Sequence, residues 1–298
     1  MKLNPRVDFA FKLIFEEHKD LLVSLINAVV GEADQVRDIE VRNTYTKKET
    51  SYKKFAILDI KAQAMNGTYY NIEVQVTDDL HYDKRSLYYW AKLYSDQLIV
   101  GDSYAELQKT IGIHILNFPL LDEADYHNTF RVLNAKTGKP LGNILELHYI
   151  ELTKVPTDLQ FIQSTLDRWS VFLARAERYD EETLPDYLSV DPIIRKAMHI
   201  FETTRLDADK RETYEARLKW LRDETSALET KYIRGKEEGI VEGIAIGKEE
   251  GIVEGIAIGE AKRQADKLEM AKKLKRRGLS IAEISEITGV SEETIAGL

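Results

Sequence analysis

Two segments with alternating polarity between residues 55 and 77 constrain this chain most. The even-numbered residues are apolar from 56 to 64 and again from 70 to 76, while most of the odd-numbered residues between them are polar. A period of two is typical of β-strands with one buried face. Asn66-Gly67 lies between the segments, and because this dipeptide readily adopts positive φ, it predicts that the strands form a β-hairpin.

The register of this hairpin decides which polar residues face each other. Opposed residues in an antiparallel pair share a face, so the two apolar sets stay together in only some registers. A two-residue loop would pair Met65 with Thr68 and mix the two faces. A three-residue loop, with Gly67 in the left-handed conformation as a G1 bulge, pairs Ala64 with Thr68 instead, and it is the register we expect.

In the expected register two carboxylates are opposed. Asp59 lies opposite Glu73, with Gln75 one step along the same face and Lys61 nearby. Directly opposed side chains have Cβ atoms roughly 5 Å apart, so the two acids repel each other unless they share a cation. Carboxylate oxygens suit a hard divalent ion such as Mg²⁺. The hairpin therefore predicts a metal site.

Asp59, followed fourteen residues later by Glu73-Val74-Gln75, resembles the motif of the PD-(D/E)XK nuclease superfamily, with Gln75 where lysine is more frequent. Two further motifs, Asp8-x-x-Phe11-Lys12-x-x-Phe15 and Arg85-Ser-Leu-Tyr88-Tyr89-Trp90, make the chain similar to the Rpn family of recombination-promoting nucleases, also described as transposases, over residues 1–150. The resemblance implies a Mg²⁺-dependent DNA endonuclease that hydrolyses phosphodiester bonds during DNA recombination or transposition.

The resemblance also implies roles for individual residues. Asp59, Glu73 and the Val74 carbonyl would hold the metal. Gln75 cannot act as a general base near neutral pH, although it can position water through hydrogen bonds, and Lys61 is a possible electrostatic substitute for the missing lysine. Asp8 matches an acidic position of the family's first helix that can border the metal, but a carboxylate in a first turn also complements the helix dipole.

Arg85 and Tyr89 are the DNA contacts that we expect. They share one helical face at i, i+4, where a guanidinium could meet a scissile phosphate and a phenol could order water. Packing of Arg85 on a tyrosine is the structural alternative. The six histidines show no ligand spacing, so we assign them no chemistry.

Periodicity predicts an α/β fold, a restriction-endonuclease-like mixed sheet flanked by helices, with a helical C-terminal extension and a Gly-repeat helix. The expected helices are 5–30, 83–98, 159–176, 192–203 and 207–232, and the expected strands outside the hairpin are 36–45, 111–118, 129–134 and 144–152. The expected domains are a nuclease-like domain over 1–155, a helical extension over 156–233, a Gly-repeat and basic helix over 234–277, and a short helix-turn-helix-like hairpin over 278–298.

The tail carries a tandem repeat. KEEGIVEGIAIG occurs at 236–247 and again at 248–259, so glycine falls at every fourth position from Gly235 to Gly259. A stripe of small residues permits close packing of like helices, and we expect a homo-oligomer through residues 235–259. A flexible linker or a weak helix is the alternative, because glycine costs roughly 1 kcal/mol per position relative to alanine in a helix.

Composition limits the class of protein. The 298 residues carry a net charge of −9 and no cysteine. The charge disfavours a protein that coats nucleic acid with its whole surface, and the lack of cysteine excludes disulfides and thiol catalysis. Charges near the start disfavour a signal peptide, so we expect a cytoplasmic protein without a membrane span.

Two alternatives to a DNA endonuclease stay open. The first is a noncatalytic DNA-binding or oligomerising protein on a nuclease-derived fold, and the second is a structural hairpin whose acids pair with Lys61 and Arg85.

Overall fold

The computed structural model describes residues 2–42, 60–158 and 161–298. The chain forms two compact units, Met1–Thr225 and Ser226–Leu298. Among the expected site residues, Asp59 lies outside the described residues.

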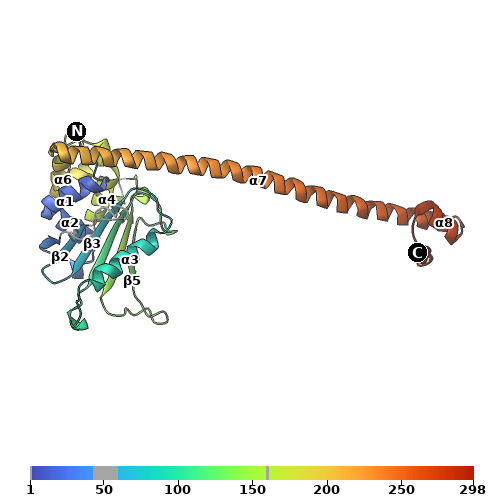
Figure 1. Ribbon diagram of the computed structural model, residues 1–298, viewed down its shortest axis with the longest axis horizontal. Coiled ribbons are helices and arrows are strands. Elements are labelled where there is room, and N and C mark those ends of the chain that lie inside the picture. The colour runs from blue at the N-terminus through green and yellow to red at the C-terminus, as the bar shows by residue number, and fades with distance from the viewer. Residues whose placement is uncertain (1, 43–59, 159–160) are drawn as a thin grey trace. The chain divides into compact units, whose positions relative to one another are not determined.

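The first unit is built on a mixed sheet of six described strands (Figure 1). Strands β1, β2 and β3 are antiparallel, β3, β4 and β6 are parallel, and β5 pairs antiparallel with β6 at the edge. This sheet and its flanking helices confirm the expected α/β architecture. In spatial order the strands are β1 (Ile39–Arg42), β2 (Ile60–Ala64), β3 (Tyr69–Gln75), β4 (Thr110–Leu116), β6 (Leu145–Glu151) and β5 (His127–Arg131).

The β2–β3 hairpin has the register expected from its polarity. Lys61 pairs with Asn71. The Ala64 amide donates to the Thr68 carbonyl at 2.9 Å, and the Gly67 amide donates back to the Ala64 carbonyl at 2.9 Å. Gly67 has a φ of 91°, so the three-residue loop with a left-handed glycine is confirmed.

Helices cover both faces of the sheet. One face packs against α1, α2, α4 and α6, where Phe15, Trp169 and Phe201 are fully buried. The other face packs against α3, through Tyr82 and Trp90. The helices of this unit are α1 (Asp8–Glu17), α2 (Lys19–Val29), α3 (Tyr82–Ser95), α4 (Thr165–Arg175), α5 (Asp186–Ser189) and α6 (Pro192–Thr203), with short 3₁₀ helices at Glu32–Asp34, Tyr104–Glu106, Leu152–Lys154 and Ala176–Arg178.

One expectation about the helices changes. The helix expected over 5–30 is two helices, because His18 between them has a non-helical φ of −119° and ψ of 77°. The helices of the expected extension over 156–233 pack on the core of the nuclease-like part: the rings of Phe15 and Trp169 are 5.6 Å apart, and the first compact unit continues to Thr225.

Gly112 on β4 has no room for a methyl group, because neighbouring side chains already fill that space. An added Cβ would lie 2.7 Å from Leu147 Cδ2 and 2.9 Å from His114 Nε2, and both side chains are buried. Gly112→Ala is therefore expected to lower the free energy of unfolding by about 1–3 kcal/mol, measured by urea denaturation. Gly31→Ala is the matched control, because its Cβ would meet nothing within 4 Å. Equal stability of the two variants would contradict the close packing inferred at Gly112.

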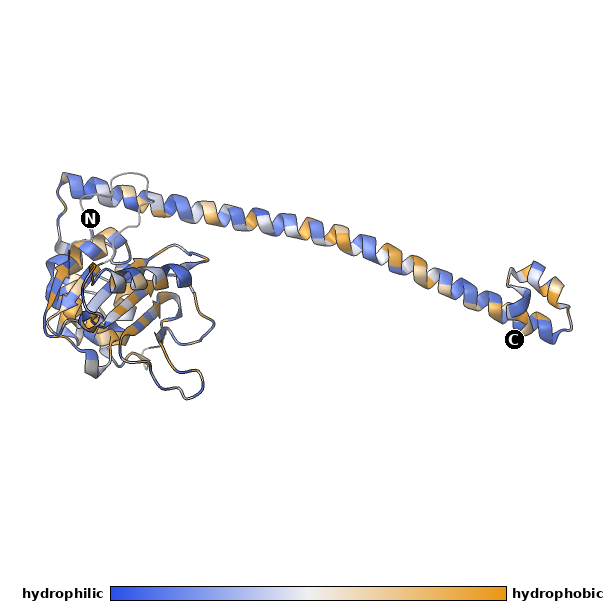
Figure 2. Cartoon of the chain, turned by 60° about the horizontal axis from the view of Figure 1, so that its bottom comes forward, coloured by the Kyte–Doolittle hydropathy of each residue, from blue (hydrophilic) through white to orange (hydrophobic). Residues whose placement is uncertain are grey.

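The second unit is helical. Helix α7 (Ala208–Arg276) continues from the first unit through the whole glycine repeat, and Figure 2 shows hydrophobic and hydrophilic residues alternating along it. Helices α8 (Ile281–Thr288) and α9 (Glu292–Ala296) follow. Ser280 and Glu283 form a capping box at the start of α8, and Gly289 after its end has the left-handed conformation, with a φ of 66°. None of the described helices is long and apolar enough to cross a bilayer.

Candidate functional site

Glu73 lies on the central strand β3, facing α3, and only 6% of it is exposed. Both carboxylate oxygens accept hydrogen bonds: Oε1 from Asn71 Nδ2 at 3.1 Å, and Oε2 from the Tyr82 hydroxyl at 2.9 Å. Asn71 is two residues earlier on the same face of the strand, and Tyr82 begins α3. The strand and the helix together fix the orientation of this carboxylate.

A buried histidine supports Tyr82 from behind. His114 on β4 is the strand partner of Glu73, and its Nδ1 lies 3.0 Å from the Tyr82 hydroxyl. Because that hydroxyl donates to Glu73, it accepts from an Nδ1–H of His114, which sets the tautomer of the imidazole. The ring of His114 stacks on Tyr149 with centroids 5.1 Å apart.

The electrostatics agree with a neutral His114. Burial lowers the pKa of His114 to about 4, an effect that Glu73 opposes and that Arg85 and His148 reinforce. At neutral pH the imidazole is therefore uncharged and serves as a hydrogen-bond donor. Sequence reasoning missed both His114 and Tyr82; the parallel pairing of β3 with β4 places His114 beside Glu73, and no local spacing in the sequence signals it.

The structure brings Arg85 to this cluster. Its guanidinium lies 4.6 Å from the centroid of the Tyr82 ring and pairs with Asp79 at 2.8 Å. Packing on a tyrosine, one of the two expectations for Arg85, is thus what the structure has. Tyr89 is half-buried on the same helix, with its ring 5.7 Å from that of Tyr88.

Gln75 and Lys61 share the face of Glu73. Gln75 Nε2 donates to the carbonyl of Thr77 at 3.1 Å and to its hydroxyl at 3.2 Å, so the amide oxygen is the end that can accept a hydrogen bond from water. Lys61, half-buried, is paired across the hairpin with Asn71. The buried Asn71 Oδ1 forms no hydrogen bond to any described residue.

Asp8 makes a different set of contacts. It is 5% exposed and binds Arg217 of α7 through two contacts, Nε to Oδ1 at 2.8 Å and Nη2 to Oδ2 at 2.7 Å. The start of α1 is nevertheless connected to the end of β3, because Arg6 donates to Asn117 Oδ1 at 3.3 Å and the Asn117 amide donates to the Gln75 carbonyl at 2.9 Å. The structure thus gives Asp8 a partner in the packing of α7.

The side-chain oxygens on and beside Glu73 are of the type that binds a hard cation. The Glu73 carboxylate, which Asn71 and Tyr82 orient, is a ligand of the kind that a hard divalent ion takes. The oxygens of Gln75 and Asn71 are also of the type that Mg²⁺ prefers. Within residues 2–42, 60–158 and 161–298, no three acidic or histidine side chains gather as a complete metal site. Asp59, the expected second carboxylate, lies outside these ranges.

Comparison with known families decides the relationship. The family of PD-(D/E)XK nuclease family transposases matches residues 5–231. The chain belongs to this family. The match starts just before α1 and ends within α7, so α4 and α6 lie inside the family domain, and the tail beyond 231 lies outside it. No curated protein and no solved structure matches the chain.

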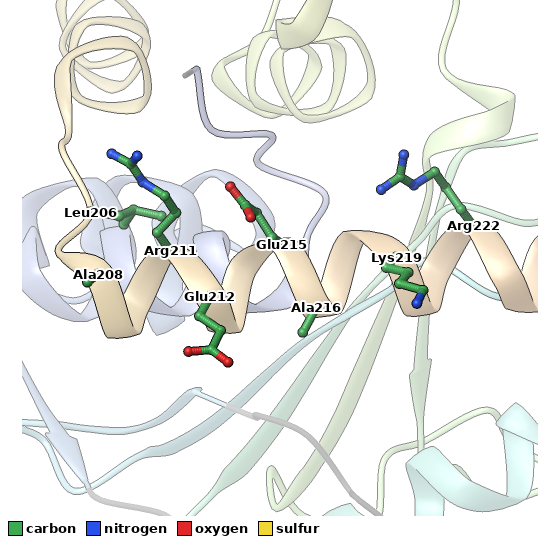
Figure 3. Close-up of a pocket in the computed structure, with 8 residues that line it drawn as sticks. All are labelled: Leu206, Ala208, Arg211, Glu212, Glu215, Ala216, Lys219 and Arg222. Carbon is green, nitrogen blue, oxygen red and sulfur yellow. The ribbon is translucent and has the colours of Figure 1, made fainter.

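A hollow in the surface runs along the start of α7 (Figure 3). Arg211, Glu215 and Arg222 point to one side of the helix, and Glu212 and Lys219 point to the other. None of the expected site residues lines it, and its mixed charges favour no particular ligand. The lining residues are Leu206, Ala208, Arg211, Glu212, Glu215, Ala216, Lys219 and Arg222.

A second polar cluster lies on β5 and β6. The buried Glu146 lies 3.0 Å from His148 Nε2 and accepts hydrogen bonds from Lys109 and Arg131, each at 2.9 Å. His148 Nδ1 lies 3.0 Å from His127 Nε2, and the two rings stack. Burial, followed by the neighbouring His148, lowers the pKa of His127 to about 4, while Glu146 opposes the shift.

Because of this depressed pKa, we expect the free energy of unfolding to decrease in acid. An unfolded chain protonates His127 near pH 6.5, whereas the folded chain does so near pH 4, so the unfolded state binds more protons between these values. Stability from this group is present above pH 6.5 and is lost as pH falls toward 4. Between about pH 7 and pH 5 the free energy of unfolding should fall in both wild type and His127→Gln. We expect the fall to be about 2 kcal/mol smaller in His127→Gln, measured by urea denaturation at each pH. Identical losses would contradict a neutral His127.

Proposed function

We propose that this protein is a Mg²⁺-dependent DNA endonuclease that hydrolyses phosphodiester bonds in DNA recombination or transposition. The observation that carries the proposal is the Glu73 carboxylate, which stands on the central strand β3, within the matched residues 5–231, and is oriented at both oxygens by Asn71 and Tyr82. Orientation of this kind is what a metal-binding carboxylate needs, because a ligand must be held in its productive geometry.

Each residue of the site would have a separate role. Asp59, Glu73 and the Val74 carbonyl would hold a divalent ion, which supplies neutralisation of the phosphate and a lowered pKa of bound water. Gln75 would orient the attacking water through its amide oxygen. Lys61 would add positive charge on the same face, and Arg85 and Tyr89 would contact the DNA from α3.

The test is cleavage of supercoiled and linear DNA by the full chain with Mg²⁺, Mn²⁺ or EDTA. Wild type is expected to cut only with metal, and Asp59→Ala is expected to abolish cutting while thermal melts show a folded chain. Absence of cutting by folded wild type under every condition would overturn the endonuclease proposal and favour a noncatalytic DNA-binding role.

We further propose that two copies associate through residues 235–259 of α7. The isoleucines beside the glycine stripe are half to two-thirds exposed, including Ile244 at 54% and Ile252 at 63%. A Cβ added at Gly239, Gly247 or Gly255 would meet nothing within 4 Å, so a second helix has room to approach closely. Ile244→Asp/Ile252→Asp should move the protein to monomer in sedimentation velocity, and an unchanged mass for wild type and variant would refute this.

A further inference from the structure

An arm extends from the edge strand β5. Residues 131–141, the 131–141 arm, form a two-stranded ribbon in which the Leu141 amide donates to the Val132 carbonyl at 2.9 Å and Leu133 pairs with Pro140. Its tip is closed by Asn134 and by Gly138, whose φ is 68°. The segment after β5 reaches past the end of the sheet in Figure 1, and every residue of the arm is exposed. The arm is therefore ordered by its own hydrogen bonds.

The charge of the arm differs from that of the whole chain. The chain carries 51 acidic and 42 basic residues, yet no Asp or Glu occurs between Tyr126 and Leu145. Arg131 at the base of the arm is paired with Glu146. Lys136 and Lys139 at the tip form no ion pair with a described residue. The tip is thus a local site of positive charge on an acidic protein, which suits a polyanion.

Apolar side chains line the same arm. Val132, Leu133 and Leu141 are 42%, 52% and 67% exposed, and an arm that only needed to be soluble would carry polar residues at these positions. A two-stranded β-ribbon fits the major groove of duplex DNA, where apolar side chains contact thymine methyl groups and lysines contact phosphates. The combination of a ribbon, an apolar face and two tip lysines fits a DNA groove better than a free phosphate.

The register of the sheet relates the arm to Glu73. Glu73, His114, Tyr149 and Asn128 form one row of paired residues across β3, β4, β6 and β5. Arg131 is three residues further along β5, so strand geometry places the base of the arm about 17 Å from Glu73. That distance corresponds to about five base pairs of duplex.

We propose that the 131–141 arm binds in a groove of double-stranded DNA, with its base about half a helical turn from the phosphodiester bond cut at Glu73 and with Lys136 and Lys139, further out, on the phosphates. The identity of the polyanion rests on the proposed function. Binding without metal tests the arm separately from the chemistry, because a chain that cannot cut DNA still displays the arm.

The experiment measures binding of a labelled duplex of about 30 base pairs by the full chain in EDTA, between about 50 and 200 mM salt. Lys136→Gln/Lys139→Gln should reduce the slope of log affinity against log salt by about 2 and weaken binding about tenfold or more near 0.1 M salt. Lys219→Gln/Lys231→Gln removes the same charge from exposed positions of α7 outside the repeat and should leave both quantities close to wild type. Leu133→Ser/Leu141→Ser should weaken binding several-fold with an unchanged slope.

Three results would overturn the inference. The first is equal affinity and slope for the tip-lysine variant and its control, with both shown folded by thermal melts. The second is preference of wild type for single-stranded RNA over duplex DNA of equal length. The third is a change in sedimentation of the arm variants without a change in DNA affinity, which would make the arm a contact between copies. Arm-dependent binding without cleavage would refute the endonuclease proposal and leave the arm standing.

Discussion

Glu73→Gln is expected to reduce metal-dependent DNA cleavage by about 10³-fold or more, because it removes a charged oxygen ligand whose contribution through the metal is several kcal/mol. The substitution keeps the shape of the side chain, and an amide oxygen can still accept the hydrogen bond from Tyr82. One amide N–H then faces the Asn71 side chain or the Tyr82 hydroxyl, so a stability loss of about 1–3 kcal/mol accompanies the change. Initial rates on supercoiled DNA, with thermal melts, measure both effects.

Tyr82→Phe is the matched comparison. It keeps the ring that packs edge-on against Phe118 and beneath Arg85, but removes the hydroxyl that joins Glu73 to His114. As a positioning residue, Tyr82 should affect metal affinity by about 10- to 100-fold, and excess Mg²⁺ should recover the rate. Excess metal should not recover Glu73→Gln. Cleavage by folded Glu73→Gln at the wild-type rate would remove Glu73 from the chemistry.

The fold was predictable where local pattern and pairing geometry coincide. The alternation of β2 and β3 and the need to keep both apolar sets on one face led to the hairpin register, which Lys61 opposite Asn71 confirms. The strand expected over 111–118, which the structure has as β4, followed equally from local pattern. The break at His18 did not, because neither glycine nor proline marks it.

The surroundings of Glu73 were less predictable for a physical reason. His114 reaches it only through parallel pairing across a long connection, and Tyr82 reaches it because α3 folds back over the sheet. A histidine within an apolar segment looks the same in the sequence whether its ring donates a hydrogen bond to a site residue or is only buried in the core. Arg217 is a still more distant case: more than two hundred residues separate it from Asp8.

Arg217→Met is expected to lower the free energy of unfolding by about 3–5 kcal/mol, because it leaves the Asp8 carboxylate buried without its cation. Lys210→Met is the matched control: Lys210 and Glu17 also join α7 to α1, at 3.5 Å, but both side chains are about half exposed, and such pairs contribute under about 1 kcal/mol. Urea denaturation compares the two variants. Equal losses would show that burial of the Asp8 pair is unimportant.

The double variant Asp8→Asn/Arg217→Met separates the two roles considered for Asp8. Removing both charges takes away the isolated buried carboxylate, so much of the stability lost in Arg217→Met should return, and a double-mutant cycle measures the coupling. If Asp8 serves only to hold α7 against α1, the stable double variant should cleave DNA at close to the wild-type rate. A stable but inactive double variant would instead place the Asp8 carboxylate in the chemistry, and Arg217 would then be the residue that holds it there.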